Sequence, residues 1–391
     1  MTHPIETRIL LIAALTLVTI SASHAQQTYI TSDRTVASGN PFNTTTAGTI
    51  NIGITAANAA LVPGVNVDIV APANALGMIA RSTSRVNMTG GMVQGFQLFD
   101  DAQFTVSGGT TGNSSIGYVT SANDRSRITV TGGTFQNGFG LTENAVGEVV
   151  GGTFNKGMSA TGDSRLTIRA GTFNAVGVQN AAVADIYDGT FRYSTTPSSQ
   201  SGSPVPVSSG VDRGGTLNIY GGNFAAQMMS VSNLSGQTGS NINIVGGNHG
   251  RLHAFNAGVF NVSGGVFNNS LICSFGSAGG RYGEYNFFGT GFSLTNARAF
   301  TLTDQYVNQF TGTMYDLRGT LADGNAVVSR YFVQNQTVAQ GASQGVNGIS
   351  FSAPVVVPEA STFALCVPPI VVLSMAVLRR SESRNESTET A

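Results

Sequence analysis

The residues best suited to chemistry in this chain are two pairs of aspartates. Asp100 and Asp101 are adjacent and precede a strand-like run, while Asp185 and Asp188 flank another such run with Arg192 close by. Two carboxylates at a defined separation carry out glycoside hydrolysis, so these four acids are the candidate catalytic groups of a carbohydrate-active enzyme. Aspartates at the edges of turns are also ordinary structural residues, and the sequence leaves both interpretations open.

The other reactive side chains give little support to metal or cofactor chemistry. His249 and His253 would share one face of a helix, but their region has the composition of strand and turn. Cys273 has no Cys or His at metal-ligand spacing, and we interpret it as a small core residue. No Asp follows the glycine pairs as calcium-binding nonapeptide repeats require, and no GxSxG motif marks a nucleophile. The sequence therefore predicts no cofactor and no metal site.

The element that must position any site is a short phrase repeated along the chain. It reads ITVTGGTF at residues 128–135, GEVVGGTF at 147–154 and LTIRAGTF at 166–173, so that successive copies start 19 residues apart. A period of this size, lengthened in places by loop insertions, is typical of stacked supersecondary units. No acid recurs at a fixed position of the repeat, so we expect no charged cleft along the stack. Copies aligned on the second residue of the glycine pair are Gly91, Gly109, Gly133, Gly152, Gly171, Gly189, Gly222, Gly247, Gly265 and Thr290, with weaker early copies at residues 50–54 and 65–69.

The repeated phrase has the pattern of a strand followed by a sharp turn. Apolar residues such as Ile128 and Val130 alternate with polar ones, which is the period of a strand with one face in a core. The glycine pair then allows a tight turn, and the Phe that follows points back inside. We therefore predict an all-β fold, a single-stranded parallel β-helix (β-solenoid) with coils of about 18–19 residues, in which Ile, Leu, Val and Phe stack on like residues. A β-sandwich with hairpin turns is the alternative.

The composition agrees with a β-rich exported protein. Charged residues make up 10% of the chain, below the roughly 25% of an ordinary soluble domain, and glycine occurs 50 times. The formal net charge is −1 with no basic block, so nucleic acid is not an expected partner. Of the two cysteines, Cys366 lies in a C-terminal apolar run, which leaves the body with one thiol and no internal disulfide.

The N-terminus reads as a secretory signal over residues 1–25. Arg8 precedes the apolar run 9–20, and small residues end at Ala25, so we expect cleavage between Ala25 and Gln26. Residues 26–48 are a polar leader or N-terminal cap, and residues 49–298 are the solenoid repeats. Within them, residues 193–213 form a Pro- and Ser-rich insertion that we read as an exposed loop with possible binding function.

The C-terminal part changes character three times. Residues 299–333 contain the turn signal ADGN at 322–325 between two β-prone runs, so we expect a β cap. Residues 334–356 are a linker. Residues 357–391 form a tail in which Pro358 and Glu359 precede an apolar run at 363–378, followed by Arg379 and Arg380. An apolar run closed by paired arginines is typical of a membrane segment with a cytoplasmic positive stop, and we expect a hydrophobic helix there.

This tail resembles a PEP-CTERM sorting domain, in which a Pro-Glu-Pro-like motif precedes an apolar helix and an arginine cluster. Pro358, Glu359, Arg379 and Arg380 match that pattern, whereas Ala360 stands where a second proline is usual and residues 381–391 extend beyond the arginines. The resemblance implies an exosortase-like processing enzyme in a bacterium that makes exopolysaccharide. The repeat body also resembles autotransporter-like parallel β-helices.

Two functions follow from these features. The first is an exported, non-enzymatic β-solenoid with a structural or adhesion role at the cell surface, in the outer envelope or in the extracellular matrix. Its tail would insert transiently or permanently in the inner membrane through residues 363–378, and its partners would be the processing enzyme and an exopolysaccharide or surface matrix. The alternative is a β-helix polysaccharide lyase or glycosidase. The alternative requires that Asp100, Asp101, Asp185 and Asp188 converge on one face with an Arg or Lys nearby.

Overall fold

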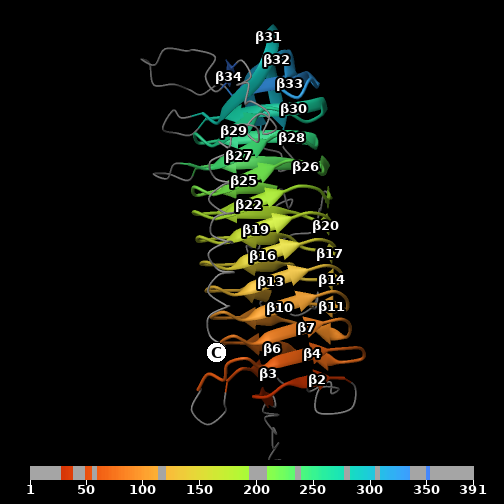
Figure 1. Ribbon diagram of the computed structural model, residues 1–391. Helices are drawn as coiled ribbons and strands as arrows, with labels where there is room; N and C mark the ends of the chain where they lie inside the picture. The colour runs from red at the N-terminus through yellow and green to blue at the C-terminus, as the bar shows by residue number, and fades with distance from the viewer. Residues whose placement is uncertain are drawn as a thin grey trace, which may run out of the picture. The chain divides into compact units, whose positions relative to one another are not determined.

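Parallel strands wound into coils make up most of the part of the chain that the computed structural model describes (Figure 1). The chain divides into two compact units, Met1–Ser352 and Ala353–Ala391, and all described residues belong to the first. Those residues contain strands and no helix. The described residues are 28–37, 49–54, 60–112, 120–192, 209–233, 239–276, 282–303, 309–334 and 349–352.

Each coil contributes up to three strands, which pair with the equivalent strands of the coils on either side. We name the resulting stacks column 1, column 2 and column 3 in the order in which a coil passes through them. Column 1 holds the strand of the repeated phrase: β13 pairs in parallel with β10 and β16, and Val130 lies in register between Val106 and Val149. The strands of column 1 are β2 (Arg34–Val36), β4 (Asn66–Ile69), β7 (Arg85–Met88), β10 (Gln103–Val106), β13 (Arg127–Val130), β16 (Val146–Val149), β19 (Arg165–Ile168), β22 (Val183–Ile186), β25 (Thr216–Ile219), β27 (Asn241–Ile244), β29 (Val259–Val262), the start of β31 (Glu284–Thr303) and β34 (Ile349–Ser352).

Columns 2 and 3 follow the glycine turn. Column 2 consists of β5 (Asn74–Ala75), β8 (Met92–Val93), β11 (Thr110–Thr111), β14 (Thr134–Phe135), β17 (Thr153–Phe154), β20 (Thr172–Phe173) and β23 (Thr190–Phe191). Column 3 consists of β1 (Thr28–Ile30), β3 (Thr49–Ile52), β6 (Gly77–Ala80), β9 (Phe96–Leu98), β12 (Thr120–Ala122), β15 (Phe139–Leu141), β18 (Met158–Ala160), β21 (Val176–Gln179) and β24 (Ser209–Asp212). Later coils run both columns together in β26 (Asn223–Ser232), β28 (Asn248–Phe255) and β30 (Phe267–Phe275).

The prediction of an all-β parallel solenoid is therefore confirmed. All pairings between successive coils are parallel in the described strands up to β30, which rules out the β-sandwich alternative built from hairpins. One sequence alignment was wrong. Residues 50–54 begin in β3 of column 3 and residues 65–69 contain β4 of column 1, so they are successive parts of the winding and not copies of one position.

The core is a set of aligned apolar stacks, as the period of two predicts. Inward residues of column 1 such as Ile128 and Val130 are buried, and the Phe of each repeat is buried in column 2. The rings of Phe135, Phe154, Phe173, Phe191, Phe224, His249 and Phe267 stack in that order with centroids 4.0–5.6 Å apart. Amide side chains follow several of these Phe residues in the sequence, and one pair of them is hydrogen-bonded side chain to side chain, where Asn155 Nδ2 donates to Gln136 Oε1 over 2.8 Å.

The glycine pairs turn the chain where a side chain would not fit. Every aligned glycine from Gly91 to Gly265 has a positive φ, for example 99° at Gly222, a region that L-residues rarely adopt. A Cβ on the preceding residue Gly221 would lie 2.2 Å from the carbonyl oxygen of Tyr187 in the coil below. Thr290, aligned as a tenth copy, is different: it lies inside β31 and pairs antiparallel with Thr320. The winding has ended there, so no glycine turn is needed.

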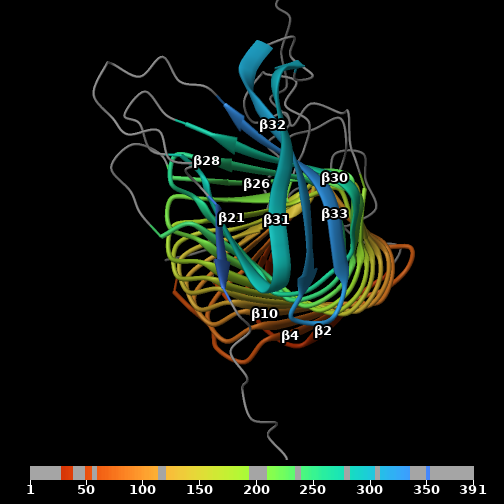
Figure 2. The same ribbon diagram turned by 90° about the horizontal axis from the view of Figure 1, so that it is seen from above.

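An antiparallel sheet follows the last coil (Figure 2). β31 leaves column 1 and pairs with β32 (Gln309–Leu321), which pairs in turn with β33 (Ala326–Gln334). β33 also pairs in parallel with β30, so this sheet joins the end of the solenoid. The residues 322–325 make the turn between β32 and β33.

Candidate functional site

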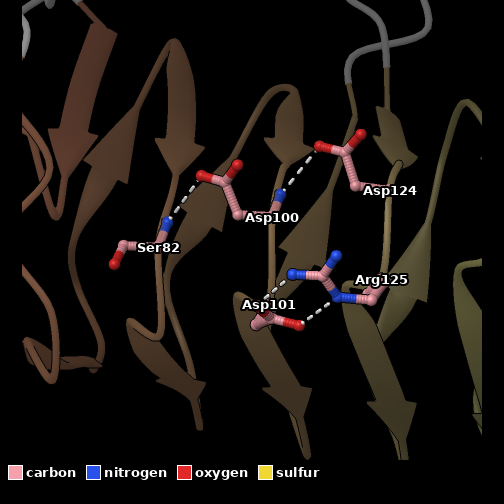
Figure 3. Close-up of polar contacts among 5 residues, drawn as sticks. All are labelled: Ser82, Asp100, Asp101, Asp124 and Arg125. Carbon is pink, nitrogen blue, oxygen red and sulfur yellow. Dashed lines mark hydrogen bonds and ion pairs between the residues drawn. The ribbon is translucent and has the colours of Figure 1, made fainter.

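The first candidate pair, Asp100 and Asp101, lies in the turn between columns 3 and 1. Asp100 has a φ of 59°, and its carboxylate accepts a hydrogen bond from the backbone N–H of Ser82 over 2.9 Å (Figure 3). The backbone N–H of Asp100 in turn donates to Asp124 Oδ2 over 2.8 Å, and that of Asp124 donates to Glu143 Oε2 over 3.2 Å. We call these four residues the turn ladder. Each carboxylate binds the N–H of the turn residue one coil earlier.

The turn ladder exists because each of these coils turns through a residue in the left-handed region. Ser82, Asp124 and Glu143 have φ values of 59°, 56° and 57°. Such a residue breaks the run of strand hydrogen bonds, and its N–H needs another acceptor. A short acidic side chain from the next coil supplies one. The expectation that no acid recurs at a fixed position is therefore wrong for three successive coils.

Hydrogen bonds within the turn ladder shift the pKa values of two of its carboxyls, Asp124 and Glu143. The backbone N–H of Asp100 is the main cause that holds the pKa of Asp124 below its usual value, with a further contribution from the Glu143 side chain. The hydrogen bond to Asp124, followed by the charge of that residue, raises the pKa of Glu143. The two neighbouring carboxyls are thus pushed in opposite directions, and Glu143 is the one that holds a proton more readily.

Asp101 points away from the turn ladder to a different partner. Its carboxylate accepts hydrogen bonds from Nε and Nη2 of Arg125 over 2.9 and 2.8 Å, and this bond lowers the pKa of Asp101 (Figure 3). The side chains of Arg125 and Asp101 are 70% and 45% exposed, so the ion pair contributes little to stability.

The second candidate pair lies in a separate structure on the outer face of column 1. Asp185 Oδ1 accepts a hydrogen bond from Asn218 Nδ2 over 2.8 Å, and Asn218 Oδ1 accepts one from Asn243 Nδ2 over 2.7 Å. The series continues from Asn243 to Asn261 and from Asn261 to Asn286, both over 2.8 Å. These five residues form the amide ladder. Asp188 takes no part in it and binds the backbone N–H of Gly189 over 2.7 Å.

The two candidate pairs do not come together. Asp100 precedes β10 and Asp185 lies in β22, with β13, β16 and β19 paired in sequence between them. Four strand spacings of about 4.8 Å place the pairs about 19 Å apart along the stack. The structure instead brings Asp124 to Asp100 and Asn218 to Asp185, and Glu143 follows Asp124 in the next coil. Sequence reasoning missed all three, although they occupy equivalent positions in successive coils.

The remaining reactive side chains have structural surroundings. His249 is buried between Phe224 and Phe267, and burial lowers its pKa to about 4. Cys273 is buried, and burial raises the pKa of its thiol. No group of three or more His, Cys, Asp or Glu suited to a metal occurs among the residues that the structure describes.

Several sequence predictions concern segments outside the described residues. These are the signal cleavage at Ala25 and Gln26, residues 193–208 of the loop predicted at 193–213, residues 335–348 and 353–356 of the linker predicted at 334–356, and the tail with Pro358, Glu359, Arg379, Arg380 and its expected helix. Where the structure describes the loop and the linker it shows strands instead, β24 at Ser209–Asp212 and β34 at Ile349–Ser352. Within the described ranges, no helix has the length and apolar character needed to cross a membrane. Comparison of the chain with protein-family models, with curated proteins and with solved structures found no match in any of the three.

Proposed function

We propose that this chain is an exported, non-enzymatic β-solenoid with a structural or adhesion role at the cell surface or in the extracellular matrix. The observation that carries the proposal is how the candidate acids are used. Asp100 binds the backbone N–H of Ser82, Asp188 that of Gly189, and Asp185 the side chain of Asn218. The carboxylates of Asp100 and Asp185 thereby join neighbouring coils, and that of Asp188 binds within its own turn, which suits a scaffold better than a catalyst.

The terminal segments complete the proposal. Residues 1–25 direct export, and Pro358, Glu359, Arg379 and Arg380 form a sorting signal for an exosortase-like enzyme. Residues 363–378 insert in the inner membrane, either transiently, before the body is released by cleavage, or permanently, as an anchor. The exported body then associates with exopolysaccharide or another surface matrix.

A carbohydrate-active enzyme of β-helix type is the second candidate. The observation that favours it is the contact between Asp124 and Glu143, whose pKa values move in opposite directions. Two neighbouring carboxyls with separated pKa values are the usual arrangement of an acid and a base in catalysis.

The test is the intact mass and cell fractionation of the full chain in its native host. We expect a species that starts near Gln26, ends near Pro358 and lies outside the membrane fraction. Replacing Arg379 and Arg380 by Ala should leave the tail uncut, while Arg384→Ala, a nearby arginine outside the pair, should be processed normally. An uncut chain that stays in the membrane in every variant contradicts the sorting proposal, and a chain that keeps residues 1–25 in the cytoplasm contradicts export.

The same fractions distinguish the two candidate functions. They are incubated with the exopolysaccharide of the host and assayed for new reducing ends or unsaturated products. A scaffold releases neither. Release that is lost in a Glu143→Gln variant with an unchanged circular dichroism spectrum would replace the structural proposal by the enzymatic one.

A further inference from the structure

Large side chains gather in a single line on the outer face of column 1. Val150, Tyr187, Tyr220 and Val245 are 43%, 46%, 44% and 46% exposed, and they make up half of the large apolar side chains exposed among the described residues. Arg169 occupies the position between Val150 and Tyr187. We call these five residues the ridge.

The ridge is straight and evenly spaced because the backbone fixes it. Each member directly follows a strand of column 1, in the order β16, β19, β22, β25 and β27 (Figure 1). The N–H of each donates to the last strand residue of the coil below, for example Tyr187 to Ile168 and Tyr220 to Ile186, both over 2.8 Å. Four strand spacings of about 4.8 Å give the ridge a length of about 19 Å.

The three central side chains of the ridge contact one another. The rings of Tyr187 and Tyr220 stack with centroids 4.9 Å apart and planes 14° apart. The guanidinium of Arg169 lies 5.2 Å from the centroid of the Tyr187 ring and is paired with Glu148 over 3.0 Å. A surface that is already ordered loses little conformational entropy when a partner covers it.

We propose that the ridge binds the ridge of a second copy of this chain, antiparallel, about a twofold axis at Tyr187. In chain order the ridge reads Val-Arg-Tyr-Tyr-Val. The axis at the third residue pairs the first position of one copy with the fifth of the other, and the second with the fourth. Val150 meets Val245 of the second copy, Arg169 meets Tyr220 of the second copy, and Tyr187 meets its own equivalent.

The charges and the spacing both favour a second copy as the occupant. For a twofold axis at Tyr187 to bring the residues into contact, the ridge residues must be equally spaced on both sides of Tyr187. The pairing of the strands in column 1 supplies this equal spacing in each copy. Arg169 is the one charged member of the ridge, and the axis places it against an aromatic ring rather than against another Arg. Tyr and Arg are also the residues that contribute most to protein interfaces. Because five residues a side make a small contact, we expect a weak dimer that depends on the high local concentration of a surface layer.

Disulfide trapping of the full chain tests the proposed geometry. All variants carry Cys366→Ser, so that the buried Cys273 is the one natural cysteine that remains. The chain with Cys366→Ser and no introduced cysteine gives the background level of cross-linking. On mild oxidation, Tyr187→Cys should form a covalent dimer by itself. Val150→Cys alone and Val245→Cys alone should not, but an equal mixture of the two should give the mixed dimer.

Controls and a second measurement make the outcome decisive. Val328→Cys, which is 50% exposed on β33 and away from the ridge, measures random collision. Sedimentation should show a concentration-dependent dimer that Tyr220→Lys weakens by about tenfold or more. The proposal is overturned if Tyr187→Cys cross-links no faster than Val328→Cys, if Val150→Cys dimerises alone as a parallel arrangement requires, or if the chain sediments as a monomer at every concentration.

Discussion

At the scale of single residues, the most unusual choice is a histidine inside the phenylalanine stack. His249 lies between Phe224 and Phe267, with ring centroids 5.6 and 5.0 Å away. Its Nε2 is hydrogen-bonded to the carbonyl oxygen of Gly246 over 2.8 Å, so this nitrogen carries the proton of the neutral ring. Nδ1 has no hydrogen-bond partner, and burial lowers the pKa of the ring to about 4. The stack therefore accepts the imidazole as a flat neutral ring.

This burial predicts a loss of stability in mild acid. The pKa of His249 is about 4 in the folded state and 6.5 ordinarily. Between pH 4 and pH 6.5, His249 is therefore protonated in the unfolded chain but neutral in the folded chain. The stability is full above pH 6.5 and falls as the pH drops towards 4, by about 3 kcal/mol in all.

His249→Phe should remove this part of the pH dependence, because Phe fits the stack and does not titrate. The measurement is denaturant unfolding of both proteins at pH 7, 5.5 and 4.5. As the pH falls, the unfolding free energy of the natural chain should decrease more than that of the variant. Parallel curves for the two proteins would show that His249 is accessible to protons in the folded state.

Much at this scale could be predicted from the sequence, but the pairing of Asp100 with Asp124 could not. The inward positions of Ile128, Val130 and Phe135 follow from a period of two, and the glycine turns follow from the paired glycines. Asp100 and Asp124 occupy the same position of the coil, yet they are 24 residues apart because the coil between them contains an insertion. Because the interval is irregular, an alignment of the sequence does not match the two positions. The hydrogen bond between the coils shows that they are equivalent in the structure.

At the scale of elements, the turn between β32 and β33 closes the column of glycine turns. Asp323 Oδ2 accepts the N–H of Gly265 over 2.7 Å, and Asn325 donates to the same carboxylate from its backbone and its side chain. Gly265 is the second glycine of the last pair in the described solenoid. The Asp323 carboxylate therefore satisfies a buried backbone group on which no further coil of this kind is stacked.

Removing this acceptor should loosen the end of the solenoid. Asp323→Ala leaves the N–H of Gly265 unpaired, at a cost of about 1–3 kcal/mol. Asp323→Asn keeps one oxygen acceptor and should recover most of the loss. Hydrogen exchange followed by mass spectrometry should show faster exchange in β30 and β33 for the Ala variant, with the coils around β13 unchanged. Equal exchange in the Ala variant and the natural chain would mean that strand pairing alone holds the end closed.

At the scale of the whole molecule, the sequence predicts the winding because the same phrase serves every coil. It places the end of the winding too late, because the repeats are expected to continue to residue 298, whereas antiparallel pairing with β32 already begins at Gly289. β31 continues for 20 residues through the point where a further turn would be due, and from Gly289 onward it pairs antiparallel with β32. This pairing is a hairpin between consecutive strands, which the repeated phrase of the coils does not encode. The ridge escaped notice because its five members lie on five different coils.

If each coil contacts only its neighbours, one coil can be removed in register without loss of the fold. Deleting Thr172–Gly189 joins Gly171 to Thr190, and the conformations match because φ is 130° at Gly171 and 135° at Gly189. Phe191 then stacks on Phe154, and Leu166 of β19 meets Leu217 of β25 with no like charges opposed.

We expect this deletion to keep the circular dichroism spectrum of the chain and to shorten the solenoid by about 4.8 Å in X-ray scattering. Deleting only residues 172–180 is the matched control, since it removes β20 and β21 and places β22 of column 1 where columns 2 and 3 should be, which turns apolar faces outward. That variant should aggregate or unfold. Failure of both deletions would mean that the coils are not interchangeable units and that the solenoid folds only as one cooperative whole.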